Sequence, residues 1–256
     1  MKAEFSEFSY GVVLSQQLVG MQLPRASIMP LLNGSPAAVK ASSDARIPDT
    51  GWPIFLQINL AECMLTPRAN GWSEHEERFF RLAVRRHRRG NAHNLLRCLA
   101  EVEPEVYYVA PAFHRRREFT RFVASQQIVQ ESRFFPLTQL PRLSGQGRHF
   151  VTYRRDDSGL RWHASGSQQV DVAASGAEWL AHLEERAEQY RLLGWRFLLD
   201  LREKLVLCLQ QTTVQPRLFD EWAVDLADVT PQGIMSDVRN LLLTQFALEV
   251  FVLRRK

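Results

Sequence analysis

A short apolar run near residue 55 gives the clearest signal of regular structure in the chain. Residues 52–59 read Trp-Pro-Ile-Phe-Leu-Gln-Ile-Asn, and Gly51 and Pro53 mark the start of the run. Its length and its Phe and Ile content are typical of a buried strand. Because side chains alternate along a strand, Gln57 and Asn59 are predicted to point to the same face. Two amides at the end of a core strand either pair with the backbone or line a site.

The apolar pattern of the first 165 residues predicts alternating helices and strands. Apolar side chains at three- and four-residue spacing predict helices over residues 4–20 and 92–102. A further helix follows Phe113-His114. Besides the central run, the strand-like segments are residues 28–32, 78–84, 106–111, 149–153 and 160–163, the last two as a hairpin. This order predicts an α/β domain over residues 1–165, with a mixed sheet flanked by helices.

The pattern changes after about residue 165. Residues 177–211 carry leucines at helical spacing for most of their length. Pro216 and Pro231 are each expected to open a further helical stretch. Residues 166–256 are therefore predicted to form an all-helical C-terminal region.

The basic side chains of the chain are almost all arginine. Only four of the 32 basic residues are lysine, and the formal net charge is +4. Arginine suits phosphate because its planar fork donates two hydrogen bonds at once. Two clusters, each following a strand-like run, are candidates for contact with the DNA or RNA backbone: Arg85, Arg86, Arg88 and Arg89, and Arg115, Arg116 and Arg117. The clusters are expected to share one rim of the sheet. The alternative is a solvated basic loop, or a face that forms salt bridges with Glu74, Glu76, Glu77 and Glu118.

Cysteine usage and hydropathy bear on the cellular compartment. Cys63, Cys98 and Cys208 are far apart and odd in number, so they indicate neither a disulfide framework nor a zinc site. The first residues lack an apolar signal core, and no apolar run approaches the ~18 residues of a membrane span. We expect a cytoplasmic protein that has no membrane partner. Phosphate-binding loops and the serine elbow of hydrolases are also missing from the sequence.

Three blocks of the N-terminal region carry a resemblance to a known family. Residues 5–11 read FSEFSYG, residues 54–57 read IFLQ and residues 106–114 read VYYVAPAFH. Together they resemble a poorly characterised bacterial family that is associated with nuclease-like folds and phage-defence gene neighbourhoods. The resemblance covers roughly residues 4–155 and implies a restriction-endonuclease-like core. It does not extend to the C-terminal region.

The resemblance implies a set of catalytic positions. In restriction-endonuclease-like nucleases an acidic residue and an acidic or Gln residue hold a divalent metal, and a Lys stabilises the attacking water. By resemblance, Asp44 and Gln57 stand at the metal-holding positions, and Glu7 is a third candidate acid. Asn59 stands where the Lys belongs and carries no charge, which departs from the family pattern. A degraded catalytic set with no cofactor is therefore expected, and Mg²⁺ would be the cofactor if the nuclease is active.

Three functional hypotheses follow. The first is a nucleic-acid-binding or scaffolding subunit of a bacterial defence-type complex, built on a catalytically degraded nuclease fold, whose C-terminal helices dock onto a protein partner. The second is an active metal-dependent endonuclease that cleaves phosphodiester bonds. The third is a purely structural subunit that makes only protein–protein contacts. A steep salt dependence of nucleic-acid binding would separate the first hypothesis from the third.

Overall fold

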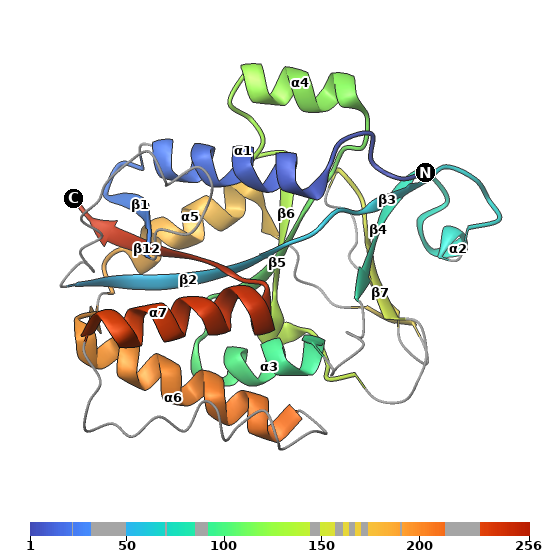
Figure 1. The fold of residues 1–256 in the computed structure, drawn as a ribbon. Helices are drawn as coiled ribbons and strands as arrows, with labels where there is room; N and C mark the ends of the chain where they lie inside the picture. The colour runs from blue at the N-terminus through green and yellow to red at the C-terminus, as the bar shows by residue number, and fades with distance from the viewer. Residues whose placement is uncertain are drawn as a thin grey trace.

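A computed structural model of the chain describes residues 1–21, 23–31, 50–69, 71–84, 92–143, 149–156, 161–163, 167–169, 174–189, 191–212 and 231–256. They form a mixed α/β structure with two sheets (Figure 1). In chain order the elements are α1 (Glu7–Gly20), β1 (Ala26–Pro30), β2 (Thr50–Ile58), β3 (Glu62–Met64), α2 (Trp72–His75), β4 (Phe79–Val84), α3 (Ala92–Val102), β5 (Val106–Pro111), α4 (Arg116–Ala124), β6 (Ser132–Pro136), η1 (Leu137–Gln139), β7 (His149–Tyr153), β8 (Arg161–His163), β9 (Ser167–Gln169), β10 (Ala174–Ser175), α5 (Gly176–Arg186), β11 (Arg191–Leu192), α6 (Trp195–Thr212), α7 (Pro231–Leu241), the π-helical turn η4 (Leu242–Phe246) and β12 (Glu249–Arg255).

The main sheet is organised around β2, the apolar run with the clearest sequence signal. Its strand order is β1-β12-β2-β5-β6-β10, and β11 pairs with the start of β2. β2 is antiparallel to β12 and parallel to β5, with Gln57 opposite Tyr108. Because β2 and β5 run in the same direction, their carboxyl ends lie at the same edge of the sheet.

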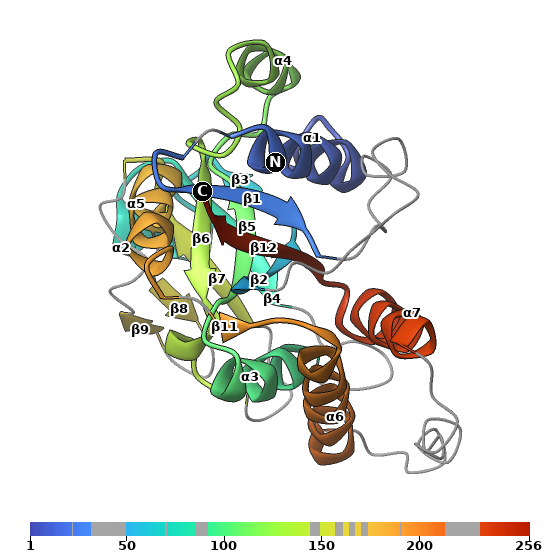
Figure 2. The same cartoon turned by 90° about the vertical axis from the view of Figure 1, so that its left-hand side faces the viewer.

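Side chains of β2 alternate between two cores, as the pattern predicts. Ile54 and Leu56 are fully buried against α1 and α5, whereas Phe55 is fully buried on the other face, against α3, α6 and α7. Figure 2 shows α1 on one side of the sheet and α3, α6 and α7 on the other. The sheet is therefore covered on both faces, which explains why β2 reads as a continuous apolar run.

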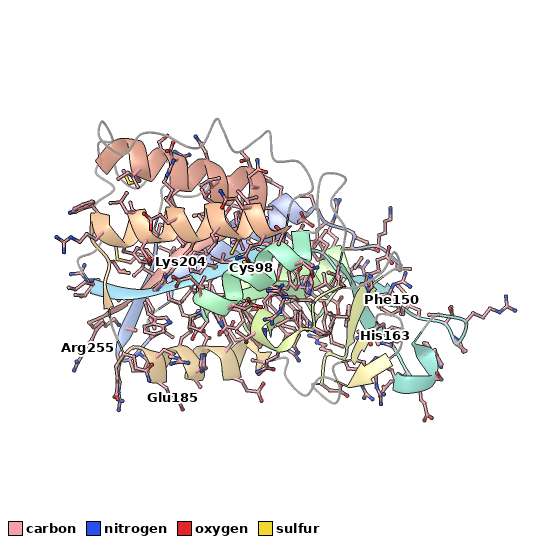
Figure 3. All side chains as sticks on the ribbon, turned by 90° about the horizontal axis from the view of Figure 1, so that it is seen from below. Cys98, Phe150, His163, Glu185, Lys204 and Arg255 are labelled. Carbon is pink, nitrogen blue, oxygen red and sulfur yellow. The ribbon has the colours of Figure 1, made fainter. Side chains whose placement is uncertain are left out.

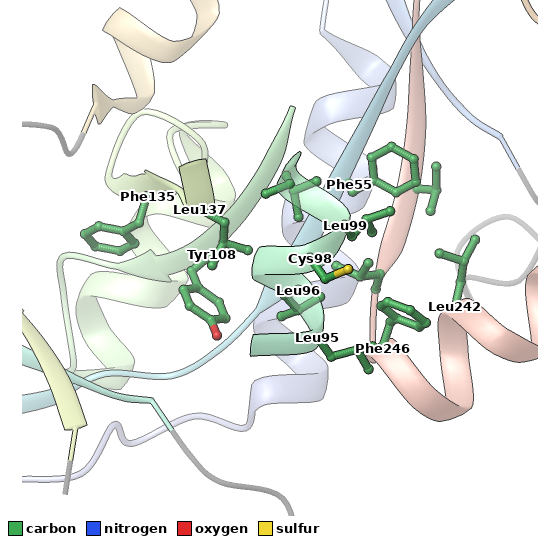
Figure 4. Packing of buried hydrophobic residues seen from close by; sticks show 14 of the residues in the cluster. Phe55, Leu95, Leu96, Cys98, Leu99, Tyr108, Phe135, Leu137, Leu242 and Phe246 are labelled. Atoms are coloured by element: carbon green, nitrogen blue, oxygen red, sulfur yellow. The ribbon is translucent and has the colours of Figure 1, made fainter. Parts of the chain in front are cut away.

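The core beneath the sheet is built by α3 and the C-terminal helices. Leu95, Leu96 and Leu99 of α3 pack between the sheet residues Phe55 and Tyr108 and the C-terminal segment with Leu242 and Phe246 (Figure 4). Burying one such side chain stabilises the fold by about 2–3 kcal/mol before entropy costs. The helical spacing of these leucines therefore directs all three into the core and stabilises the packing of α3 on this face of the sheet.

The second sheet has the order β3-β4-β7-β8-β9. Tyr153 of β7 connects it to the main sheet: its ring contacts that of Phe135 on β6 edge-on, with centroids 5.1 Å apart, and its hydroxyl donates to the Pro111 carbonyl of β5 at 2.8 Å. β7 and β8 pair as the predicted hairpin, and Phe150 stacks on His163 at 4.5 Å (Figure 3).

The C-terminal region is not all-helical, contrary to the prediction for residues 166–256. Residues 249–255 form β12, which lies between β1 and β2 in the main sheet. The short strands β10 and β11 also come from this region and pair with β6 and β2. All four residues of the apolar run Val250–Leu253 are buried, because a central strand buries side chains on both faces. Periodicity does not distinguish such a run from a segment of a buried helix. A division of the chain at residue 165 would separate β12 from both of its partners.

The stretch predicted to be helical for most of residues 177–211 contains two helices, α5 and α6. The chain between them pairs Arg191 and Leu192 with Gly51 and Thr50, and Gly194 precedes the first turn of α6. α5 ends at Arg186, well before Gly194, so the pairing of β11 with β2 separates the two helices. Within the described ranges, no helix is long and apolar enough to cross a membrane.

The position of β12 predicts a large effect of a substitution near the C-terminus. Phe251 is 2% exposed and lies opposite both Ile54 and Pro30. We expect Phe251→Ala to lower the free energy of unfolding by about 3–5 kcal/mol, measured by urea denaturation. The control is Arg255→Ala, because Arg255 lies on the same strand with its side chain in solvent (Figure 3), and a change within about 0.5 kcal/mol is expected. Equal small effects of the two variants would contradict a central β12.

Candidate functional site

Gln57 and Asn59 share one cavity at the carboxyl end of β2. The cavity has a volume of about 150 Å³, and its lining comprises Gln57, Asn59, Leu82, Ala83, Val84, Ala92 and Tyr108. The Gln57 amide donates to the carbonyl of Phe246 at 3.5 Å, and the Asn59 amide donates to the carbonyl of Gln57 at 3.2 Å. Both amides are thus held by long backbone hydrogen bonds, and the lining residues carry no carboxylate.

The structure does not bring Glu7 into this cavity. Glu7 lies in the first turn of α1, which packs on the face of β2 opposite to Gln57. Its carboxylate accepts the backbone N–H of Leu60 at 3.3 Å. Asp44, the other predicted acid, lies outside the described residues, so its role stays a prediction. Across the part of the chain that is described, no group of three or more His, Cys, Asp and Glu side chains could hold a metal ion.

A buried histidine supports the wall of the same cavity. The Nδ1 atom of His93 lies 3.0 Å from the Tyr108 hydroxyl, and its Nε2 atom lies 2.9 Å from the Pro141 carbonyl. A carbonyl only accepts, so Nε2 carries the proton and Nδ1 accepts from Tyr108. Burial lowers the pKa of His93 to about 4. The ring is therefore neutral near pH 7 and holds Tyr108 in place.

The arginine cluster after β5 begins α4 and faces solvent. Arg115, Arg116 and Arg117 are exposed, as is Arg121 one turn later, whereas Phe122 is buried on the opposite side of the helix. Figure 1 shows α4 projecting from the body of the protein above α1. None of the side chains of the three consecutive arginines makes a hydrogen bond or ion pair with a described residue. Their donors are free to bind an anion.

Acidic groups near α4 are already engaged. Glu4 accepts the backbone N–H of Arg116 at 3.0 Å, and Glu118 accepts the backbone N–H of Arg115 at 3.1 Å. Burial would raise the pKa of Glu118, but the backbone N–H groups of Arg115 and His114 and the charge of Arg155 lower it. Glu118 is therefore ionised and bound at the helix terminus, where it stabilises α4 and leaves the arginine side chains unpaired.

The other arginine cluster, residues 85–89, lies outside the described residues. Its attachment point is described: Val84 ends β4 and lines the Gln57 cavity. The α4 cluster lies toward the start of β4, where the ring of Phe80 is 6.4 Å from that of His114. Phe80 and Val84 are about 13 Å apart along a strand. The shared rim of the two clusters stays a prediction.

A polar network at the opposite end of β5 escaped the sequence analysis. Glu105 is 2% exposed, accepts from the Tyr107 hydroxyl and from Nε2 of His182 at 3.3 Å, and forms an ion pair with Nε of Arg186 at 3.1 Å. Burial would raise the pKa of Glu105, but the hydrogen bonds from His182 and Tyr107 and the charge of Arg186 lower it. Trp179, His182 and Arg186 occupy one face of α5, at positions i, i+3 and i+7. The helical spacing of these three residues could have been recognised in the sequence, but it does not identify Glu105 as their partner.

Comparison of the chain with protein-family models, with curated proteins and with solved structures finds no match.

The neutral state of buried His93 predicts how stability depends on pH. In the unfolded chain a histidine binds a proton below about pH 6.5, whereas folded His93 does so only below about pH 4. Stability is therefore lost as pH falls from about 6.5 to about 4, by at most about 3 kcal/mol. Urea denaturation across this range should show a steeper loss for the wild type than for His93→Gln. Parallel pH dependences of the two proteins would contradict this assignment.

Proposed function

We propose that this protein is a nucleic-acid-binding subunit that contacts the phosphate backbone through the exposed arginines of α4. The observation that carries the proposal is the set of three consecutive arginines whose side chains have no partner among the described residues. Exposed, unpaired arginines at the start of a helix are suited to phosphate oxygens, because each guanidinium donates to two of them. Contacts of this kind give affinity and salt dependence without reading the base sequence.

The amphipathic form of α4 supports this assignment. On a helix of 3.6 residues per turn, Arg116, Arg117 and Arg121 fall on one side, and Phe119 and Phe122 fall on the other. The rings of Phe119 and Phe5 stack with their centroids 4.8 Å apart, and the guanidinium carbon of Arg155 lies 5.2 Å from the ring centroid of Phe122. The helix is thus fixed to the protein by its aromatic side, and its basic side is directed outward. A rigid platform of this kind reduces the entropy lost on binding.

Binding is favoured over metal-dependent cleavage by the donors that the β2 cavity presents. Gln57 and Asn59 are neutral amides with backbone partners, and Glu7 lies on the opposite face of the strand. Hard divalent cations usually recruit several carboxylate oxygens in addition to substrate phosphate. We therefore propose that a restriction-endonuclease-like catalytic set, if this chain descends from one, has been degraded.

The C-terminal helices are the proposed contact with a protein partner in a defence-type complex. Trp195 and Leu207 of α6 and Leu192 just before it are large apolar side chains that are 51%, 51% and 81% exposed. Contiguous apolar patches mark sites that another protein covers, and we propose that these side chains contribute to such a site. Scaffolding through this surface would be compatible with nucleic-acid binding at α4, which lies on the other side of the sheet (Figure 1).

A matched pair of triple variants tests the α4 assignment. We expect Arg115→Gln/Arg116→Gln/Arg117→Gln to weaken binding to DNA or RNA by about two orders of magnitude at 0.1 M salt, if each arginine contacts one phosphate. The slope of log K against log salt should fall by about 2–3. Fluorescence anisotropy with labelled oligonucleotides of several sequences measures both quantities.

The control for that test is Arg196→Gln/Arg239→Gln/Arg254→Gln, which removes the same charge from exposed positions on α6, α7 and β12. Its affinity and salt slope should stay close to those of the wild type. Equal losses in the two triple variants would show that only net charge matters. Absence of salt-sensitive binding in the wild type would overturn the proposed function.

A cleavage assay addresses the nuclease alternative. We expect no cleavage of linear, circular or single-stranded DNA with Mg²⁺ or Mn²⁺ beyond that seen with EDTA, because the described cavity offers amides in place of carboxylates. Gel electrophoresis of the products measures this. Metal-dependent cleavage that is lost in Asp44→Ala would establish the endonuclease instead.

A further inference from the structure

A second and larger cavity lies beside Glu105, at the amino end of β5. Its volume is about 350 Å³, within the range of small-molecule sites in proteins. The lining comprises Pro104, Glu105, Tyr107, Pro136, Thr138, Gln139, Ala174, Trp179, His182 and Arg186. Prolines, alanine and aromatic rings thus surround a small number of convergent polar groups, which is the usual composition of a ligand site.

Glu105 orients the cationic and hydrogen-bond-donating side chains that line this cavity. Its two oxygens accept from Tyr107 and His182 and form an ion pair with Arg186, so they have little capacity for a ligand. Because a carboxylate only accepts, His182 directs Nε2–H toward Glu105 and keeps Nδ1 available. The carboxylate therefore fixes the orientation of two side chains that line the cavity, much as an acidic residue orients a metal-ligating or catalytic histidine.

Arg186 keeps part of its guanidinium free. Its Nε atom forms an ion pair with Glu105 at 3.1 Å and its Nη1 atom donates to Gln189 at 2.6 Å, while Nη2 has no described partner. The guanidinium carbon also lies 5.5 Å from the ring of Trp52, which holds the side chain from a second direction. The group is thus fixed in one place and retains donors for an oxyanion.

The charges of the lining define the class of ligand. The positive charge of Arg186 balances the negative charge of Glu105. A ligand cation would therefore gain little electrostatic attraction and would be repelled by the guanidinium. An oxyanion would accept from Nη2 of Arg186, and the hydroxyl of Thr138 and the amide of Gln139 are exposed at the same cavity. Pro104, Pro136 and Ala174 offer apolar contacts for the remainder of the molecule.

We propose that this cavity binds a small organic anion, an apolar ring that carries one carboxylate or phosphate group, with the anionic group on Arg186 and the ring against the proline-lined wall. This site is independent of the nucleic-acid contact proposed for α4, which lies beyond the other end of β5.

The indole side chains of the protein provide the readout. Trp179 lines the cavity and Trp52 lies against Arg186, whereas Trp195 is on α6 and 51% exposed. Benzoate and phenyl phosphate are titrated into the ¹⁵N-labelled full chain, and the indole N–H signals are assigned by single Trp→Phe variants. We expect the Trp179 and Trp52 signals to shift with half-saturation in the millimolar range, which is ordinary for ligands of about ten heavy atoms, while Trp195 stays in place.

Matched compounds separate the two halves of the ligand. Benzyl alcohol has the ring without the charge, and acetate and inorganic phosphate have the charge without the ring. Each should bind at least about tenfold more weakly than benzoate or phenyl phosphate if both contacts contribute. The stronger of the two ring-bearing anions identifies a carboxylate or a phosphate as the preferred group. Equal shifts with benzyl alcohol would overturn the role of Arg186.

Two variants test the location. Arg186→Gln removes the charge and should weaken binding at least about tenfold, while Arg196→Gln, at an exposed position on α6, should not. Ala174→Leu fills part of the cavity without altering the Glu105 network, and it should abolish the shifts even if Arg186→Gln does not fold. The proposal is overturned if the Trp179 signal does not move in the wild type, or if Ala174→Leu binds the probes as the wild type does.

Discussion

The pairing of β12 with β2 is the interaction on which the rest of this structure depends. β12 occupies the position between β1 and β2, so the sheet is continuous only when the last described strand is in place. α7 leads into β12 through η4, α6 packs against α7, and Val250 and Val252 add to the core that contains α3. The face that positions Gln57 and Tyr108 is therefore built jointly by the beginning and the end of the chain.

The sequence predicts local elements well and long-range pairing poorly. The alternation in residues 52–59, the leucines of α3 and the hairpin of β7 and β8 follow from nearest-neighbour spacing, and the structure confirms them. Residues 249–255 were expected to be part of a helical region because an apolar run of that length fits a buried helix segment or a buried strand equally well. The strand forms because β1 and β2 both offer backbone groups that β12 can pair with. The sequence near residues 249–255 does not reveal these distant partners.

The candidate sites show the same division between local and distant information. The α4 arginines are adjacent in sequence, so their clustering could be read directly, whereas their lack of partners depends on where Glu4 and Glu118 bind. Gln57 and Asn59 share a cavity as strand alternation implies. Glu105 contacts His182 and Arg186, which are far away in the sequence. A glutamate just before a strand does not by itself indicate such partners.

The place of β12 also has a consequence for how the chain matures on the ribosome. β2 and β1 are synthesised early, yet the strand that joins them emerges only after α7. Until then the edge of β2 presents unpaired backbone groups along a strongly apolar segment, which is a template for association with other chains. The nascent chain is thus exposed to aggregation at this edge until β12 is synthesised and pairs with β2.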